Sequence, residues 1–335
     1  MIIDDILYGQ DEIDQPVLIE LLKAPELQRL QQVGMGGYYP GSPYASGHRE
    51  YTRYRHSVGV MLLLRRFNAS LEEQIAGLIH DVSHSAFSHT IDYILREAEG
   101  EKTQNCQDRL HDNFVRRSSL AAIITRHGFN LDRILDESCF PLKENQLPDI
   151  CADRIDYCLR AGVLSGDLTL EDKDVILGRL VIHNGSFVFD NLNAAIKFSR
   201  LFYHLNHNMW SGFASAVQFC VSALMFRRAI DISLLKLEDF YNRGDTEIIQ
   251  MIETFGLQDK ELASYYKMLQ NPPEYFCDNA ELCLDRIFCK SRTVDPLVIT
   301  AALKPQRVSE LDSLYATMIA DQPKFKEYRI GIRNN

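Results

Sequence analysis

The segment Ala76–His89, AGLIHDVSHSAFSH, joins an apolar helical run to a dense group of polar side chains. That group holds three histidines and an aspartate: His80, Asp81, His84 and His89. His56 lies upstream of it and Asp153 downstream. Two imidazoles and two carboxylates can surround a divalent cation and still leave positions open for water and phosphate oxygens. A chain with this pattern is expected to build helices around a metal site suited to hydrolysis.

Most of the remaining chain also has helical periodicity. Ser70 and Glu73 have the spacing of a capping box at the start of the helix that leads to His80. If that helix continued past His80, then Asp81 and His84 would border one face. The apolar spacing predicts helices over these ranges: Val17–Lys23, Pro25–Val33, Arg53–Phe67, Leu71–His80, Phe87–Glu97, Leu147–Ala161, Ala194–Tyr203, Phe213–Ile230 and Leu237–Phe255.

Turns and strands are predicted in fewer places. Asn184-Gly185, within the alternating segment Arg179–Asp190, indicates a β-hairpin. Gly34–Tyr44 is rich in Gly and Pro and is expected to be a loop, as are the polar residues 98–110. Beyond residue 270 we expect three strands and a helix: Arg286–Lys290, Val298–Ala301, Tyr328–Ile332 and Val308–Ala320. The predicted fold is therefore mainly α, with a helical domain over residues 1–235 and a smaller mixed α/β portion over residues 236–335.

Composition and charge narrow the class of protein. Hydrophobic residues make up 46% of the chain and charged residues 24%, as in globular proteins that dissolve in water. The first residues lack the features of a signal peptide, and the apolar stretch Ala214–Phe226 is too short to span a bilayer. The eight cysteines form no CxxC pair, which favours reduced thiols in a cytoplasmic protein. We expect no membrane association.

The formal net charge of −10 argues against general nucleic-acid binding. An anionic substrate would therefore need local positive charge, from a bound metal ion and from arginines near the polar segments. The candidates are Arg49, Arg53, Arg55, Arg154 and Arg160.

At this point the chain resembles a known family. Arg53-x-x-His56, then His80-Asp81, then Asp153 is similar to the H…HD…D signature of the HD-domain phosphohydrolases. Further segments follow the order seen in the deoxynucleoside triphosphate triphosphohydrolase branch of that superfamily: PELQRL (25–30), GGYYPG (36–41), RYRHSVGV (53–60) and DRIDY (153–157). The resemblance is good over residues 1–160 and weak over 161–255. It implies an HD-domain helical bundle.

The resemblance also implies a role for each matching position. It makes His56, His80, Asp81 and Asp153 the metal ligands, and it places Arg53 and Arg154 on phosphate. Tyr157 would lie against a sugar, and His84 and His89 would face the scissile phosphate. Asp92 and His111 would form the acid–base pair.

General chemistry agrees with these roles. A phosphate ester is anionic, so a metal ion and arginines lower the barrier by neutralising charge as it develops. A histidine titrates in the range that suits proton transfer near neutrality.

The chain departs from the triphosphohydrolase branch on a later helix. Where the branch has an Arg, a Tyr and a Lys, the aligned residues are Leu205, Phe213 and Ala216. The aspartate that follows the family tyrosine is Ala161, and the nearest match to a family glutamine is Met35. Losing cationic groups alters recognition of a triphosphate, because unpaired buried charge costs several kcal/mol. Three other residues could substitute as contacts: Arg200, His204 and His207.

Three functions therefore stay open from the sequence. The first is a metal-dependent hydrolase of a nucleotide, by default of a deoxynucleoside triphosphate, releasing tripolyphosphate. The second is a phosphomonoesterase or phosphodiesterase for a smaller ester, with a second metal held through His84 and His111. The third is a regulator that binds a ligand and catalyses little. The ligand set suits Mn, Fe, Mg, Ni or Zn, and the resemblance implies a homo-oligomer.

Overall fold

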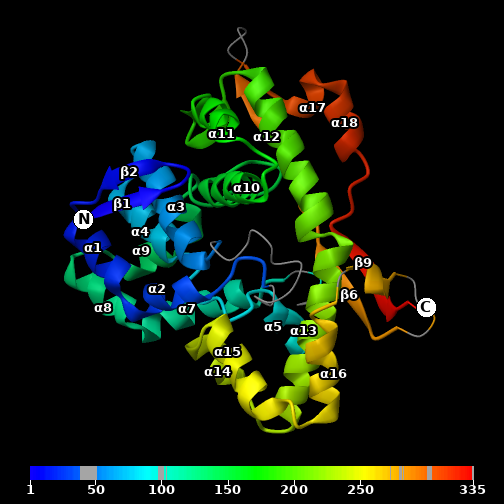
Figure 1. Cartoon of the computed structure of the whole chain (residues 1–335). Helices are drawn as coiled ribbons and strands as arrows, with labels where there is room; N and C mark the ends of the chain where they lie inside the picture. Colours follow the sequence, from blue (N-terminus) through cyan, green and yellow to red (C-terminus); the bar gives the residue numbers. More distant parts are fainter. Residues whose placement is uncertain are drawn as a thin grey trace.

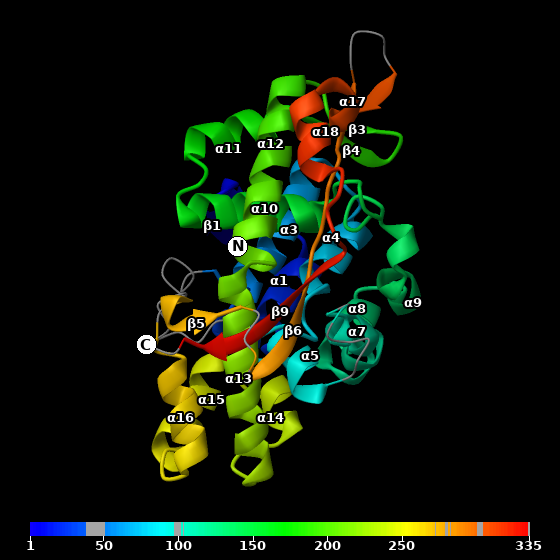
Figure 2. The ribbon, with the colours of Figure 1, turned by 90° about the vertical axis from the view of Figure 1, so that its right-hand side faces the viewer.

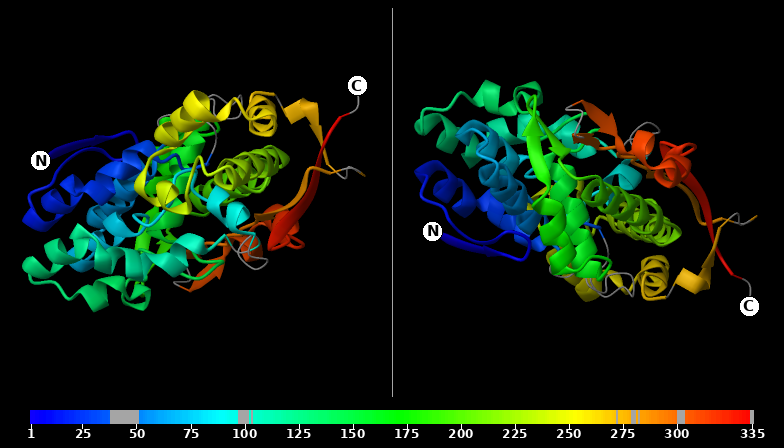
Figure 3. Two further views of the ribbon diagram at one scale, coloured as in Figure 1. Left: turned by 90° about the horizontal axis from the view of Figure 1, so that it is seen from below. Right: turned by 90° about the horizontal axis from the view of Figure 1, so that it is seen from above.

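The computed structural model describes residues 1–37, 51–96, 102, 104–271, 273–278, 281, 283–299 and 304–333. The described part is mainly helical with small β-sheets at its periphery, which confirms the predicted fold class (Figure 1). The two termini lie on opposite sides of the molecule (Figure 3). Most of the predicted loop Gly34–Tyr44 lies outside the described residues.

Three helices form the centre of the domain. Helix α3 (Arg53–Arg66) packs against α4 (Leu71–Ile79) on one side and against α10 (Ala152–Ser165) on the other. Thr52 begins α3 by accepting a hydrogen bond from Arg55 N, as a Thr N-cap does. Helix α4 ends at Ile79, one residue before His80, so His80 and Asp81 lie at a helix end and not on a continuing face.

Only half of the expected capping box of α4 is formed. Ser70 Oγ accepts a hydrogen bond from Glu73 N at 3.1 Å, as predicted. The Glu73 carboxylate does not return to Ser70. It accepts hydrogen bonds from the backbone N–H groups of Leu142 and Lys143, at 2.8 and 3.0 Å. Glu73 therefore anchors the segment that leads into α10.

The amino-terminal part covers one side of this centre (Figure 1). It begins with an antiparallel hairpin of β1 (Ile2–Asp5) and β2 (Gly9–Glu12), which the sequence had not indicated. It continues with short helices: α1 (Pro16–Lys23), α2 (Pro25–Arg29) and a 3-10 turn (Leu30–Gln32). The apolar side chains of this part pack in one cluster with α3, α4 and α8 (Ser119–Arg126).

Between His80 and α10 the helices differ from the predicted ones. The first is shorter than predicted, and a later one begins within the predicted loop. Helix α5 spans Thr90–Leu95, whereas Phe87–Glu97 had been predicted. Helix α7 spans Cys106–Arg117, so the end of the predicted loop 98–110 is helical. Short helical turns then lead to α10: α9 (Leu131–Leu135) and Glu137–Cys139.

Two long helices run end to end along the molecule (Figure 2). Helix α12 (Leu192–Leu205) passes through a π-helical turn (Asn206–Trp210) into α13 (Phe213–Asp231). The stretch Leu192–Asp231 is long and apolar enough to cross a membrane, by length and composition alone. Because 72% of its most apolar window is buried inside the protein, a core helix explains it.

The C-terminal residues contribute to two separate sheets. The predicted hairpin, β3 (Leu180–His183) and β4 (Ser186–Phe189), is formed. It is extended by β7 (Leu297–Ile299), parallel to β4, and by β8 (Pro305–Arg307). Strand β6 (Asp285–Lys290) and β5 (Phe276–Cys277) pair with β9 (Phe325–Ile332), and this sheet packs on α13.

Further helices complete the C-terminal part: α11 (Leu170–Leu177), α14 (Leu237–Asn242), α15 (Asp245–Met251), α16 (Lys260–Met268), α17 (Val308–Leu311) and α18 (Ser313–Ile319). The predicted helix Val308–Ala320 is thus present as two short ones. Because α13 packs against α16, β6 and β9, the chain on both sides of residue 235 shares one apolar core. The domain boundary at that residue stays a prediction.

Gly59 allows α3 and α10 to approach closely. A Cβ atom at this position would fall well inside van der Waals contact with Asp156 Oδ2 and Arg160 Nη2. Both of those side chains are fully buried and tied to each other, so neither can move away freely. Glycine is therefore required here by packing and not by backbone angle.

We predict that Gly59→Ala lowers the free energy of unfolding by about 3 kcal/mol, between the usual costs of overpacking and of breaking a buried ion pair. Urea unfolding measures it. The matched control is Gly77→Ala in α4, where the added methyl meets the flexible end of Leu64. Equal stability changes in the two variants would contradict the packing argument.

Candidate metal centre and its pocket

Three helices deliver the atoms of the candidate metal centre. His56 comes from the first turn of α3, His80 from the end of α4, and Asp153 from the first turn of α10. His56 Nε2 lies 2.9 Å from Asp153 Oδ1 and 3.2 Å from His80 Nε2, and His80 Nε2 lies 3.6 Å from Asp153 Oδ1. Ligand atoms that share one ion at about 2.1 Å are about 3.0–3.4 Å apart, so the three atoms fit a divalent cation.

The other ring nitrogen of each histidine is already engaged. His56 Nδ1 donates to Asp156 Oδ1 at 2.8 Å, and His80 Nδ1 donates to the carbonyl of Gly77 at 2.7 Å. These contacts occupy Nδ1 of each ring and turn Nε2 toward the other candidate ligand atoms. A carboxylate or carbonyl behind the imidazole is the usual support of a histidine that ligates a metal.

Asp81 lies next to this group and also contacts Arg53. Its carboxylate oxygens are 3.5 Å from His80 Nε2 and 3.9 Å from His56 Nε2. Arg53 Nη1 donates to Asp81 Oδ2 at 2.7 Å. Burial alone would raise the pKa of Asp81, but the charges of Arg53 and His80 outweigh it and hold the pKa well below its usual value. Asp81 is therefore an anion beside the group of His56, His80 and Asp153, with one oxygen held by Arg53, and its place among the metal ligands stays a prediction.

Two further histidines lie beside Asp81. His84 Nε2 is 3.3 Å from Asp81 Oδ1, and its ring meets that of His89 edge to face, with centroids 5.2 Å apart. Burial lowers the pKa of His84 to about 3, with the charge of Arg53 acting in the same direction. The turn between them, at Phe87 and Ser88, has positive φ at both residues.

The expected pair of Asp92 and His111 is not formed within the described parts of the chain. Asp92 Oδ2 lies 3.5 Å from His89 Nδ1, and Asp92 Oδ1 accepts a hydrogen bond from Cys106 N. His111 Nδ1 instead contacts Ser83 Oγ at 3.2 Å. Burial lowers the pKa of His111 to about 4. The carboxylate of Asp92 therefore contacts His89 and not His111, because α5 places Asp92 and His89 one turn apart.

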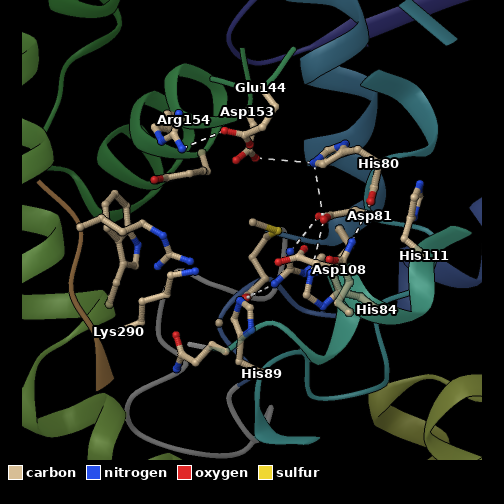
Figure 4. A pocket seen from close by; sticks show the side chains of 18 of the residues that line it. His80, Asp81, His84, His89, Asp108, His111, Glu144, Asp153, Arg154 and Lys290 are labelled. Atoms are coloured by element: carbon tan, nitrogen blue, oxygen red, sulfur yellow. Dashed lines mark hydrogen bonds and ion pairs between the residues drawn. The ribbon is translucent and has the colours of Figure 1, made fainter. Parts of the chain in front are cut away.

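A pocket of about 500 Å³ opens in front of these side chains (Figure 4). This volume lies within the range of ligand sites, about 300–1,000 Å³. The pocket reaches all three residues predicted to contact substrate: Arg53, Arg154 and Tyr157. Arg154 forms an ion pair with Glu144 at 2.8 Å and donates to the Asn145 carbonyl at 2.5 Å, so its guanidinium is held at the pocket wall.

Aromatic side chains form another part of the wall. Tyr157 meets Trp210 edge to face at 4.9 Å between ring centroids, and its own ring is 6.3 Å from that of His56. Within the described residues the buried hydroxyl of Tyr157 has no hydrogen-bond partner. Trp210 belongs to the π-helical turn between α12 and α13 and was not anticipated from the sequence.

Several positively charged candidates do not reach the pocket. Arg160 is fully buried between Asp5 and Asp156, so its expected role as a phosphate contact is wrong and its role is structural. Arg55 is exposed on α3, and Arg49 lies outside the described residues. The proposed substitutes also point elsewhere: Arg200 pairs with Asp312, His204 with Asp167, and His207 stacks on Tyr203.

The positions that differ from the triphosphohydrolase branch are mostly apolar core. Leu205, Ala216 and Ala161 are buried, and Phe213 packs on Tyr328. Of this group only Met35 lines the pocket. The sequence reasoning missed other pocket residues, among them Lys143, Glu144, Asp108, Lys290 and Arg292. It also missed Asp156 as the partner of His56; the only signal was its place in the DRIDY segment.

Comparisons with known proteins agree with this geometry. A family model described as an HD domain matches residues 53–161, the segment that supplies all four candidate ligands. YdhJ of Bacillus subtilis, an uncharacterised protein, is 37% identical over 204 residues, which are 61% of this chain and 60% of that protein. The metal-dependent phosphohydrolase cns2 of Cordyceps militaris is 31% identical over 285 residues, covering 81% of this chain and 73% of that protein.

Two more distant relatives are informative. The deoxynucleoside triphosphate triphosphohydrolase SAMHD1 of Danio rerio is 30% identical over 150 residues, which are 39% of this chain and 23% of that protein. A phosphohydrolase from Bacteroides thetaiotaomicron has the same fold over the full length of both chains, with a TM-score of 0.69 and 16% identity. Because the similarity to cns2 extends over most of both proteins and an HD-domain model matches residues 53–161, the chain belongs to the HD family of metal-dependent phosphohydrolases.

Proposed function

We propose that this hydrolase acts on a nucleotide, with a deoxynucleoside triphosphate as the first candidate and tripolyphosphate as its product. The observation that carries the proposal is the aromatic wall of Tyr157 and Trp210 beside the candidate metal centre. Such a wall suits a sugar or a base. The partial similarity to SAMHD1 supports the same substrate class.

The metal ligands of the proposal are His56, His80, Asp81 and Asp153. A divalent ion held there would polarise the phosphoryl oxygens and activate water for attack on phosphorus. The side chains around the ligands are arranged for an anionic substrate. Arg53 is fixed by Asp81, by Ser88 Oγ at 3.0 Å and by the Met35 carbonyl at 3.3 Å, so it presents charge without reorganising.

Proton transfer would fall to the histidines on the same side. His89 Nδ1 lies against Asp92, so its Nε2 is the atom free to exchange a proton with the substrate. Burial lowers the pKa values of His84 and His111, so both are neutral near pH 7 and can accept a proton from water. We propose His89 as the donor to the leaving oxygen, with Asp92 orienting it. Burial lowers the pKa of His89 as well, and the hydrogen bond to Asp92 opposes that shift and favours the protonated ring.

The resemblance also leads us to propose a cytoplasmic homo-oligomer. Light scattering of the purified chain measures its mass in solution directly.

A panel of nucleoside mono-, di- and triphosphates and simple phosphoesters, assayed with Mn²⁺ or Mg²⁺, tests the substrate. We expect turnover of deoxynucleoside triphosphates with equal release of nucleoside and tripolyphosphate. Orthophosphate release from a small monoester alone, with two metal equivalents per chain, would favour the phosphomonoesterase. No turnover at any ordinary enzymatic rate would favour a ligand-binding regulator.

His80→Ala removes one ligand atom and is expected to abolish both metal retention and turnover. Metal content by mass spectrometry and hydrolysis of the best panel substrate measure these effects. His127→Ala is the matched control, because His127 lies on the surface against Glu20. A metal-free His80→Ala protein with full activity would refute the mechanism.

Asp156→Asn is expected to weaken metal binding about 10- to 100-fold, the usual effect of removing the partner of a ligating histidine. The amide cannot hold the imidazole of His56 as the carboxylate does. Titration of the apoprotein with Mn²⁺ measures the affinity. Tyr8→Phe is the control: it removes the 2.9 Å hydrogen bond from Tyr8 to Asp156 and leaves His56 supported. An unchanged affinity in Asp156→Asn would remove the argument for this support.

A further inference from the structure

Lys290 and Arg292 reach the pocket from the C-terminal part of the chain. Lys290 is the last residue of β6, and Arg292 follows in the next segment. Figure 4 shows Lys290 across the pocket from His80, Asp81 and His111. Nothing in the resemblance to the HD family over residues 1–160 assigned a function to this strand.

The other cations at the pocket already have acidic partners. Arg53 is paired with Asp81 at 2.7 Å, Lys143 with Glu137 at 2.8 Å, and Arg154 with Glu144 at 2.8 Å. Within the described parts of the chain, the side chains of Lys290 and Arg292 form no hydrogen bond or ion pair. Two cations that form no ion pair with the described residues therefore line a pocket in a protein whose net charge is −10.

The strand holds these two residues in defined positions. Ile287 and Cys289 are buried in the core that includes α13, so the alternation of β6 turns Lys290 to the other face. Its register is set by β9, where Lys290 pairs with Phe325. Beyond the strand, Asn206 fastens the backbone: its Oδ1 accepts from Arg292 N at 2.9 Å, and its Nδ2 donates to Ser291 Oγ at 3.0 Å.

The burial and the charges around Lys290 are suited to binding an anion. Burial lowers its pKa to about 8, and the nearby charge of Arg292 acts in the same direction. The charges of Asp108 and Asp92 oppose the shift; burial raises the pKa of the Asp108 carboxyl to about 6, so that carboxyl loses its charge below about pH 6. Phosphate oxygens would supply the missing negative charge.

We propose, building on the nucleotide hydrolysis proposed above, that Lys290 and Arg292 bind the phosphate groups of the substrate that are not attacked. The pocket then selects a substrate with at least two phosphate groups. These side chains take over, from a different element, the positive charge that is missing at Leu205 and Ala216. The C-terminal strand is in this way part of the substrate site.

Binding of inorganic tripolyphosphate tests the assignment without turnover. With Mg²⁺ in excess, calorimetry should give a dissociation constant about 10-fold higher for Lys290→Gln and for Arg292→Gln than for the unchanged chain. Lys290→Arg keeps the charge and should bind nearly as well as the unchanged chain. The control is Arg286→Gln on the same face of β6, whose side chain is exposed and paired with Glu327. Equal affinity in the unchanged chain and both Gln variants would overturn the proposal.

Kinetics separate this inference from the proposed function. In Lys290→Gln we expect KM for a nucleoside triphosphate to rise about 10-fold, while kcat/KM for p-nitrophenyl phosphate stays within about twofold. Equal losses on both substrates would contradict a contact with the additional phosphates. If no nucleotide is hydrolysed, tripolyphosphate binding that depends on Lys290 and Arg292 still supports the anion site, and only the nucleotide assignment fails.

Discussion

The buried carboxylate of Asp156 joins three parts of the molecule that the metal centre requires. One oxygen accepts from His56 Nδ1 on α3, both accept from Arg160 on the same helix α10, and Tyr8 of the amino-terminal hairpin donates to the second. Arg160 is in turn paired with Asp5 of β1. Removing one member of such a buried group costs about 3–5 kcal/mol, since it leaves an uncompensated charge. The same network that stabilises the fold therefore orients His56, the first candidate ligand of the metal centre.

What could be predicted from the sequence was local. Apolar spacing located α3, α4, α12 and α13, and the Asn184-Gly185 turn located the hairpin, because these depend on neighbouring residues. The ligand residues could be named through their resemblance to a family pattern. The hydrogen-bond partners of polar residues could not be predicted in the same way. Glu73 had the spacing of a capping box, but its carboxylate accepts hydrogen bonds from Leu142 and Lys143, which only tertiary packing brings near. Asp92 had been assigned to His111 by the resemblance, but it contacts His89, three residues earlier in the chain, which is a local contact.

The substrate side of the pocket was harder to predict than the metal side. His56, His80 and Asp153 lie near helix ends, where the position of a residue along the chain determines the direction of its side chain. Lys290 and Trp210 lie on a strand and on a π-helical turn, and neither residue type in its sequence context indicates a pocket. The direction of Lys290 follows from the pairing of β6 with β9 and from the burial of Ile287 and Cys289. Those contacts join residues far apart in the sequence.

The candidate metal ligands and part of the pocket wall come from different elements. The candidate ligands are held by α3, α4 and α10, whose packing leaves little freedom, since even the methyl group of an alanine at Gly59 would clash. Arg53, Arg154 and Tyr157 reach the pocket from α3 and α10 themselves, whereas Trp210, Lys290 and Arg292 reach it from segments after α10. Leu205 and Ala216 are buried and Phe213 packs on Tyr328, so the three positions aligned with the triphosphohydrolase branch lie in or against the apolar core and not in the pocket lining. Because Lys290 and Arg292 lie outside these helices and their side chains form no ion pair among the described residues, a change at either leaves the packing around the candidate ligands in place.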